Sequence, residues 1–326
     1  MIRTLALFSG GLDSVLAAKL ILEQGIEVIG VNFITPFFAS DNEQKVKQIA
    51  ANLGIELKTI GLGDEYVEIV KSPKYGYGKN LNPCLDCRIL MLKRAKGLLQ
   101  RKRLSFIITG EVLGQRPMSQ HKNAFALIEK ESNLKGLILR PLSAKLLPLT
   151  LAEKENWVDR EKLLDIQGRS RRIQIDLANK WGISNYFSPS GGCLLTDPIF
   201  SQRMRDLLRY QDTSLDNIEL LKIGRHFRLS PRTKLIVGRD ERENNFLVEL
   251  IKTEDVCFRP IEVKGPIGIG KGNFDDSLIG LATQIIARYC DEKEKAVEIG
   301  WKLSNQKMKK IKVMAMSEKE IEEFRI

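Results

Sequence analysis

The sequence is poor in the side chains that bind transition metals. Its 326 residues include 2 histidines and 5 cysteines. A structural zinc ion takes four ligands, and a chain with so few histidines is poorly supplied for one. An odd cysteine count in a chain of this length also argues against a disulfide framework. Any clustering of the five cysteines therefore indicates metal or redox chemistry.

Long apolar runs are also missing from the sequence. No stretch approaches the ~20 apolar residues of a membrane span, and the first apolar run is too short for a secretory signal. We therefore expect a cytoplasmic protein with no membrane partner. The composition, 43% hydrophobic and 29% charged, is globular, and the length predicts about two domains. The net charge of +11 fits a polyanionic partner such as RNA, although a soluble basic protein would also carry it.

A glycine-rich turn, Ser9–Ser14, lies between the apolar run Leu5–Phe8 and a helical pattern that starts at Val15. A strand, a glycine turn and a helix start present unpaired backbone N–H groups to one point, an arrangement that binds phosphate. A P-loop would need a Lys followed by Ser or Thr, and Leu12-Asp13-Ser14 stand there instead.

The turn resembles the SGGxDS loop of the ATP pyrophosphatases, which cut ATP between its α- and β-phosphates. The resemblance implies that Ser9, Gly10, Gly11 and Ser14 hold the pyrophosphate and that Asp13 is catalytic and places Mg²⁺. An ordinary glycine-rich turn is the competing interpretation.

Strand and helix patterns alternate through the first part of the chain, at residues 2–8, 15–24, 26–33, 43–53 and 55–60. Such alternation predicts an α/β fold with a doubly wound parallel sheet, and the resemblance implies the adenine nucleotide alpha hydrolase type. Ligands of such sheets lie beyond the carboxyl ends of the strands. The resemblance further implies that adenine lies against the end of the second strand, at Asn32 and Phe33.

Two cysteines, Cys84 and Cys87, follow a long loop at 61–83 and begin a predicted helix. A helix N-terminus lowers thiol pKa, so the pair suits a metal, an iron–sulfur cluster or a redox couple. Two buried structural cysteines are the alternative. The helix then carries a basic group, either an RNA contact or a solvated face, that includes Lys93, Arg94, Arg101 and Lys102.

A fourth strand at 106–109 leads into Gly110–Gln120, which contains the sequence GEVLGQ and a later Ser-Gln. This stretch, with Arg140-Pro141-Leu142 downstream, is similar to the characteristic motifs of tRNA 4-thiouridine synthetases. Glycines and polar groups at a strand end suit a nucleotide or target base, and we expect Gly110 and Gln115 to contact ATP. Another strand-to-helix turn is the alternative.

The rest of the chain divides into a helical extension and an α+β region. We expect the domains to be 1–148, 149–211 and 212–326. In the last, strands are predicted at 234–238, 246–251, 257–263, 296–303 and 311–316, with helices at 275–290 and after Ser317. Val237–Leu247 resembles a motif of the NFACT RNA-binding domain, which implies that Arg239 and Arg242 contact RNA. A packing module without RNA is the alternative.

A third cysteine, Cys193, lies in the glycine-containing loop 188–193, whereas Cys257 and Cys290 fall on patterned elements and should be core residues. Three thiolates and an open iron fit a [4Fe-4S] cluster, as in the cluster-bearing branch of tRNA thiolases. A persulfide on one cysteine, with another to resolve it, is the competing mechanism.

The resemblance implies an ATP-dependent tRNA sulfurtransferase that adenylates a uridine carbonyl oxygen and replaces it with sulfur, most simply giving 4-thiouridine. Its partners would be tRNA and a sulfur donor, either sulfide or a cysteine desulfurase, and the oligomeric state stays open, a homodimer included. The THUMP-type and rhodanese regions of that family have no counterpart here, so 2-thiouridine and 2-thiocytidine enzymes remain alternatives. So do an amide- or lysine-ligating pyrophosphatase and a non-catalytic, ATP-responsive RNA-binding protein.

Overall fold

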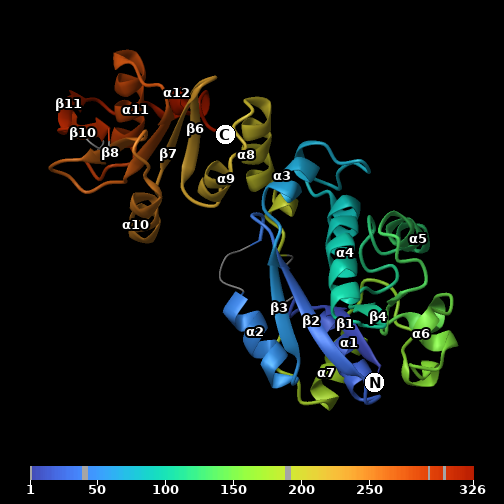
Figure 1. Cartoon of the computed structure of the whole chain (residues 1–326). Coiled ribbons are helices and arrows are strands. Elements are labelled where there is room, and N and C mark those ends of the chain that lie inside the picture. The colour runs from blue at the N-terminus through green and yellow to red at the C-terminus, as the bar shows by residue number, and fades with distance from the viewer. Residues whose placement is uncertain (1, 39–42, 188–191, 293, 304–305) are drawn as a thin grey trace. The chain divides into compact units, whose positions relative to one another are not determined.

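The computed structural model forms two compact units, Met1–Asp197 and Pro198–Ile326 (Figure 1). It describes residues 2–38, 43–187, 192–292, 294–303 and 306–326. The boundary at 197 differs from the expected boundaries at 148 and 211. No helix in the described part of the chain is long and apolar enough to cross a membrane.

A parallel sheet of five strands forms the centre of the first unit, in the order β3-β2-β1-β4-β5. Its strands are β1 (Arg3–Leu7), β2 (Glu27–Ile34), β3 (Glu56–Gly61), β4 (Phe106–Thr109) and β5 (Ile138–Leu139). The order runs outward from β1 in one direction and then resumes at β4 on the other side. The predicted doubly wound sheet is therefore confirmed, and its ligand crevice should lie where β1 and β4 end.

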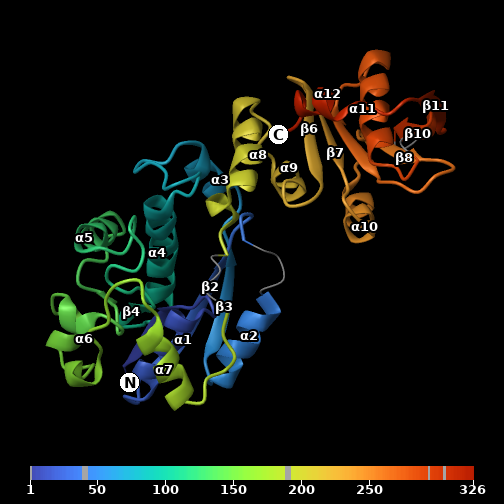
Figure 2. The same ribbon diagram turned by 180° about the vertical axis from the view of Figure 1, so that it is seen from behind.

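Helices cover both faces of this sheet (Figures 1 and 2). They are α1 (Leu12–Leu22), α2 (Glu43–Asn52), α3 (Asp64–Lys71), α4 (Cys84–Arg101), α5 (Lys122–Glu131), α6 (Leu151–Lys154) and α7 (Arg172–Lys180). Ala6 and Phe8 share a buried cluster with residues of α1 and α2. Since side chains alternate along a strand, Leu5 and Leu7 face the opposite side, where α4 contacts β1.

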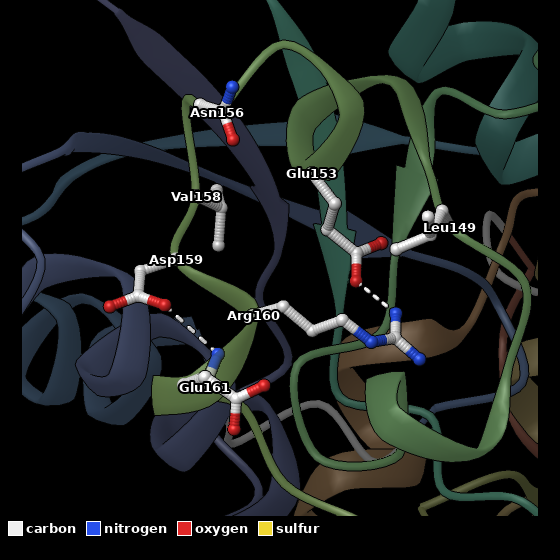
Figure 3. Close-up of a pocket in the computed structure, with 7 residues that line it drawn as sticks. All are labelled: Leu149, Glu153, Asn156, Val158, Asp159, Arg160 and Glu161. Atoms are coloured by element: carbon white, nitrogen blue, oxygen red, sulfur yellow. Dashed lines mark hydrogen bonds and ion pairs between the residues drawn. The ribbon is translucent and has the colours of Figure 1, made fainter.

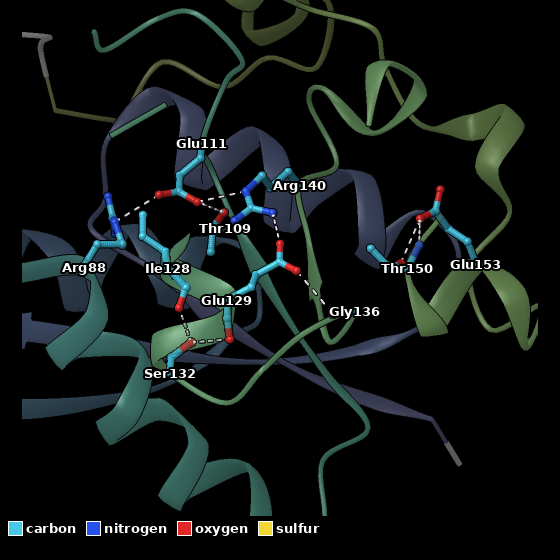
Figure 4. Close-up of polar contacts among 10 residues, drawn as sticks. All are labelled: Arg88, Thr109, Glu111, Ile128, Glu129, Ser132, Gly136, Arg140, Thr150 and Glu153. Carbon is cyan, nitrogen blue, oxygen red and sulfur yellow. Dashed lines mark hydrogen bonds and ion pairs between the residues drawn. The ribbon is translucent and has the colours of Figure 1, made fainter. Parts of the chain in front are cut away.

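The predicted helical extension is divided between the units: residues 149–197 pack with the sheet domain, whereas 198–211 belong to the second unit. Ile166 and Ala178 lie in one buried cluster with Leu12 and Leu16 of α1, and α7 contacts α1 directly. Backbone hydrogen bonds from Phe187 to Gly10 and from Leu194 to Phe37 attach the residues that follow α7 to the same unit. The predicted capping box at Thr150 and Glu153, which opens α6, is confirmed (Figure 4).

The second unit is an antiparallel sheet of six strands in the order β11-β10-β8-β9-β7-β6. Its strands are β6 (Arg225–Ser230), β7 (Thr233–Val237), β8 (Val256–Pro260), β9 (Gly268–Gly272), β10 (Val297–Leu303) and β11 (Lys309–Val313). Its helices are α8 (Pro198–Arg209), α9 (Leu215–Leu220), α10 (Glu241–Leu250), α11 (Asp276–Arg288) and α12 (Glu318–Glu322). Helix α11 packs on one face, and α9 and α10 pack on the other. The predicted α+β class is confirmed.

The strand predicted at 246–251 is wrong, because residues 246–250 belong to α10 and Ile251 is its C-cap. Asp240 caps this helix by accepting a hydrogen bond from the Glu243 N–H. Only one apolar face is buried: Leu247 is inaccessible, whereas Phe246 and Val248 on either side of it are exposed. A short apolar run satisfies both strand and helix periods, and the cap decides between them. The capping box predicted at Ser317 is present and opens α12.

Candidate nucleotide and cysteine site

The predicted phosphate loop occupies the turn between β1 and α1. Gly10 has a φ of +73°, in the left-handed region that favours glycine, and this turns the chain into the helix. The Ser14 hydroxyl donates to the Gly11 carbonyl (2.8 Å) and lies 3.3 Å from the Ser9 hydroxyl. The two serines and the glycine backbone thus meet at one point beside the N-terminus of α1, where an anion is favoured.

Asp13, in the first turn of α1, has one carboxylate oxygen engaged and one without a hydrogen-bond partner. Its Oδ2 accepts a hydrogen bond from Gln115 Nε2 (3.2 Å) and lies 3.6 Å from an Arg171 nitrogen. Its Oδ1 is buried and has no hydrogen-bond partner among the described residues. Burial raises the pKa of Asp13, and Arg171 and Gln115 oppose this rise. A buried carboxylate oxygen without a partner fits the hard oxygen ligand that Mg²⁺ prefers.

Gly110, at the end of β4, packs directly against the backbone of the phosphate loop. A Cβ at this position would lie 2.5 Å from the Ser14 nitrogen and 2.7 Å from the Asp13 carbonyl oxygen. Only glycine therefore allows β4 to approach the first turn of α1. The contact between Gly110 and ATP stays a prediction. The structure gives this glycine a steric role that does not depend on ATP, because it allows β4 to approach α1.

The two residues predicted to receive adenine lie inside β2 rather than at its end. Asn32 is half-buried and pairs with Thr59, and the strand continues to Ile34. The Phe33 side chain is 6% exposed and belongs to the core. Because the Phe33 side chain is buried, only the Phe33 backbone is free to face a nucleotide.

The Cys84–Cys87 pair begins α4 as predicted, and two polar side chains fix the loop that precedes it. The buried carboxylate of Asp86 accepts hydrogen bonds from the Lys74 and Tyr75 N–H groups, both at 3.1 Å. The Asn82 amide donates to Cys84 Sγ at 3.1 Å. Asp86, between the cysteines, thus anchors the loop, and Asn82 of that loop contacts the Cys84 sulfur.

The described residues on either side of 188–191 are hydrogen-bonded to two other parts of the site. The Phe187 N–H donates to the carbonyl of Gly10 in the phosphate loop (2.9 Å). The Leu194 N–H donates to the Phe37 carbonyl (2.8 Å), and Cys193 forms an antiparallel bridge with Phe38, just beyond β2. Ser188–Gly191 of the predicted loop lie outside the described residues.

The three predicted cysteines come within electrostatic reach of one another. Burial raises the pKa of Cys193 to about 12, and the charges of Cys87 and Cys84 add to the rise. Burial also raises the pKa of Cys87, to which the Tyr66 hydroxyl is hydrogen-bonded. The predicted lowering of thiol pKa is therefore wrong for Cys87, because desolvation outweighs the helix N-terminus. All five cysteines are free.

The donor set fits a cluster better than a single ion. Among the described residues, no three His, Cys, Asp or Glu side chains surround one metal position. In an iron–sulfur cluster each thiolate binds its own iron, so three neighbouring cysteines are a donor set of the right kind. The cluster on Cys84, Cys87 and Cys193 stays a prediction. Cys290 is buried as predicted, and Cys257 is half-buried.

Arg116 lies close enough to both halves of the site to influence each. Its charge acts on Asp13 of the phosphate loop and on Cys87 and Cys193. The side chain is exposed, so it is accessible to a substrate. Sequence analysis missed Arg116, although it directly follows Gln115, and gave no signal for Tyr66 or Arg171.

A buried ionic network connects the end of β4 with the cysteine helix (Figure 4). Glu111 is 2% exposed and pairs with Arg88 of α4 (3.0 Å) and with Arg140 (3.1 Å). Arg140 also pairs with Glu129 (2.7 Å). Since Arg88 follows Cys87 directly, Glu111 ties the cysteine helix to the strand end beside the phosphate loop.

The predicted RNA-contacting residues are mostly exposed. On α4, Lys93 and Arg101 are exposed and Arg94 pairs with Glu65, while Lys102 caps the helix C-terminus. In the second unit, Arg242 is exposed and Arg239 is paired with Glu243. Their RNA contacts stay predictions.

A cavity of about 320 Å³ opens near Arg160–Lys162 (Figure 3). Glu153, Asp159 and Glu161 line it, and Arg160 pairs with Glu153. None of the predicted site residues lines this cavity.

Comparison with known proteins divides the chain in two. Residues 2–146 match the family described as thiamine biosynthesis protein (ThiI), and residues 224–325 match the NFACT protein RNA binding domain. A probable tRNA sulfurtransferase of Geobacillus sp. is 32% identical over 145 residues, 43% of this chain and 34% of that protein. The tRNA-specific 2-thiouridylase MnmA of Campylobacter concisus is 35% identical over 91 residues, 26% of this chain and 27% of that protein.

A solved structure, the U34-tRNA thiolase NcsA of Methanococcus maripaludis with its [4Fe-4S] cluster, aligns with a TM-score of 0.36 at 17% identity. That alignment covers 68% of this chain and 73% of NcsA. The chain spans about a third of the length of the Geobacillus relative and about a quarter of the Campylobacter one. The resemblance found in the sequence is confirmed: residues 2–146 match the thiamine biosynthesis protein (ThiI) family and are similar to a probable tRNA sulfurtransferase, and residues 224–325 match the NFACT RNA-binding domain.

Proposed function

We propose that this protein is an ATP-dependent tRNA sulfurtransferase that replaces a uridine carbonyl oxygen with sulfur, with 4-thiouridine as its product. One observation carries the proposal. The charge of Arg116 acts both on Asp13 of the phosphate loop and on Cys87 and Cys193, which supports a nucleotide site and a cysteine site close to each other.

The phosphate loop is suited to the first half of the reaction. A carbonyl oxygen is a very poor leaving group, and attack of the uracil oxygen on the α-phosphorus of ATP converts it into part of AMP and releases pyrophosphate. Backbone N–H groups, Ser9 and Ser14 would stabilise the charge that develops on the pyrophosphate. Asp13, through its unpartnered Oδ1, would hold Mg²⁺, which neutralises the same charge.

Cys84, Cys87 and Cys193 would hold a [4Fe-4S] cluster, which would supply sulfur taken from sulfide or a cysteine desulfurase. Sulfur at the sulfide level would add to the activated ring carbon, and AMP would leave with the former carbonyl oxygen. Arg116, exposed and within electrostatic reach of Asp13 and Cys193, is suited to hold an anionic group between the two halves of the site. A persulfide route would need only two of the three cysteines.

The nucleotide half of the proposal is tested by single-turnover AMP formation with tRNA. Asp13→Asn should slow this step by roughly 10²–10³-fold, the usual cost of one electrostatic group in an active site. Asp165→Asn, which changes an exposed aspartate of the same unit, is the matched control and should be neutral. Unchanged AMP formation in Asp13→Asn would refute the role of Asp13, and an absence of tRNA-dependent pyrophosphate release in the wild type would refute the enzyme.

The sulfur half is tested by iron analysis and absorption of anaerobically purified protein. The protein should be brown with about four irons, and Cys→Ala at 84, 87 or 193 should remove both the cluster and thiolation. Cys257→Ala is the control and should leave both intact. A colourless, fully active anaerobic preparation would contradict the cluster and favour the persulfide route.

A further inference from the structure

The second unit has a small aromatic cavity at one end of its sheet. The cavity measures about 270 Å³, and its lining includes Trp301 of β10, Val256 of β8, Phe274 and Ile279. Trp301 pairs with Phe258 and Leu303 pairs with Val256, so these side chains share the sheet face on which α11 packs. The cavity therefore lies between that face and the first turn of α11. Ligand pockets usually measure about 300–1,000 Å³, so this one suits a single flat ring.

A basic side chain lies beside the cavity, on a lysine-rich edge strand. Lys309 pairs with Trp301 across β10 and β11, and its Nζ lies 4.9 Å from the Trp301 ring centroid. Residues 302–312 contain five lysines, namely Lys302, Lys307, Lys309, Lys310 and Lys312. Of these, Lys310 pairs with Glu298, and the four in 307–312 are exposed. An edge strand rich in lysine is positioned to contact the phosphates of a strand whose base enters the cavity.

The polar rim of the cavity indicates which bases would fit. Glu254 and Asn273 both line it. A carboxylate accepts a hydrogen bond from an exocyclic amino group, as of cytosine N4, whereas uracil offers no such group. The rim thus favours an amino-bearing base over uracil.

We propose that the cavity lined by Trp301 and Phe274 binds one unpaired, amino-bearing nucleobase of an RNA strand whose phosphate contacts Lys309 of β11. This inference rests on the proposed function, since it names where the tRNA substrate, outside the base to be modified, meets the second unit. Aromatic stacking and an electrostatic groove are the two components of single-strand recognition.

The test measures Kd values of the full-length protein for fluorescent oligocytidylate and oligouridylate. Trp301→Leu keeps apolar volume but removes the ring, and should weaken oligocytidylate binding by roughly 5- to 150-fold. Trp301→Phe keeps an aromatic ring and should stay within a few-fold of the wild type. Thermal unfolding of both variants checks that the fold is retained.

Charge variants distinguish a phosphate contact beside the cavity from a general effect of positive charge on RNA binding. Lys309→Ala should reduce the slope of log Kd against log salt by about 0.7. It should also weaken binding more than Lys312→Ala, which removes the same charge from the same strand but from its opposite face. Glu254→Gln should reduce the preference for cytosine over uracil.

Equal Kd values for Trp301→Leu and the wild type would overturn the cavity proposal. They would leave the proposed enzyme intact, because tRNA-dependent pyrophosphate release is measured independently. Conversely, loss of oligocytidylate affinity in Trp301→Leu supports the cavity even in a protein that shows no thiolation.

Discussion

Glu111 offers the sharpest test of the energetics of the first unit. The change Glu111→Gln keeps the shape of the side chain but removes a charge that is 2% exposed. It leaves Arg140, itself 4% exposed, without one of its two carboxylate partners. Removal of one member of a buried ion pair costs about 3–5 kcal/mol. Arg140 retains Glu129 and Arg88 is partly exposed, so we expect the lower end, about 3 kcal/mol.

The assay is thermal and urea unfolding of the full chain, followed by a signal from the first unit. For a unit of this size, each kcal/mol shifts Tm by about 2–4 °C, so Glu111→Gln should unfold roughly 6–12 °C earlier. The matched control is Glu65→Gln, which removes the same charge from an exposed pair with Arg94 and should cost about 0–1 kcal/mol. Equal losses in the two variants would refute the reasoning.

The pH dependence provides a second readout of the same group. Burial raises the pKa of Glu111, but Arg88 and Arg140 lower it further, so its net pKa lies below the ordinary 4.5. A carboxyl whose folded pKa is depressed contributes stability above its unfolded pKa and loses it as pH falls through the folded value. The difference between the wild type and Glu111→Gln should be complete at neutral pH and shrink below about pH 4.5.

Two further predictions address other parts of the chain. Gly110→Ala places a Cβ 2.5 Å from the Ser14 nitrogen and should destabilise the first unit by about 1–3 kcal/mol and impair pyrophosphate release. Gly97→Ala, with no neighbour closer than 3.9 Å, should instead be stabilising by about 0.5–1 kcal/mol, and the reverse order in urea unfolding would contradict the packing argument. Burial lowers the pKa of Lys234 to about 7, so between pH 7 and 10 the unfolded chain binds more protons and the free energy of unfolding of the second unit should rise with pH. Lys234→Met should flatten that rise in urea titrations, and an unchanged slope would show that other groups cause it.

Several local patterns predict structure at its observed place, although the apolar run at 246–251 shows that a local pattern can mislead. The glycine turn before α1, the cysteine-led helix and the boxes at Thr150 and Ser317 are contiguous patterns of the first kind. The alternation of strands and helices also predicts the parallel sheet, because few topologies satisfy it.

Long-range packing set the limit of the sequence prediction. Tyr66 approaches Cys87, and Phe187 approaches Gly10, only because the sheet brings distant segments together. Burial of the cysteine helix start, which reversed the expected direction of the Cys87 pKa shift, depends on the same packing. The first unit extends beyond the expected boundary at 148 in part because α7 shares a core with α1, a contact that carries no sequence marker.

The backbone hydrogen bonds that Phe187 and Leu194 donate have a thermodynamic consequence. One ends on Gly10 of the phosphate loop and the other on Phe37, beyond β2. A ligand that orders the phosphate loop at Gly10 would therefore also stabilise the hydrogen bond between Phe187 and Gly10. Thermodynamic linkage makes any such effect reciprocal. If bound nucleotide changes the affinity of the cysteines for their ligand by some factor, then that ligand changes the affinity for nucleotide by the same factor. Amide hydrogen exchange at Phe187 and Leu194 would report both sides of this cycle.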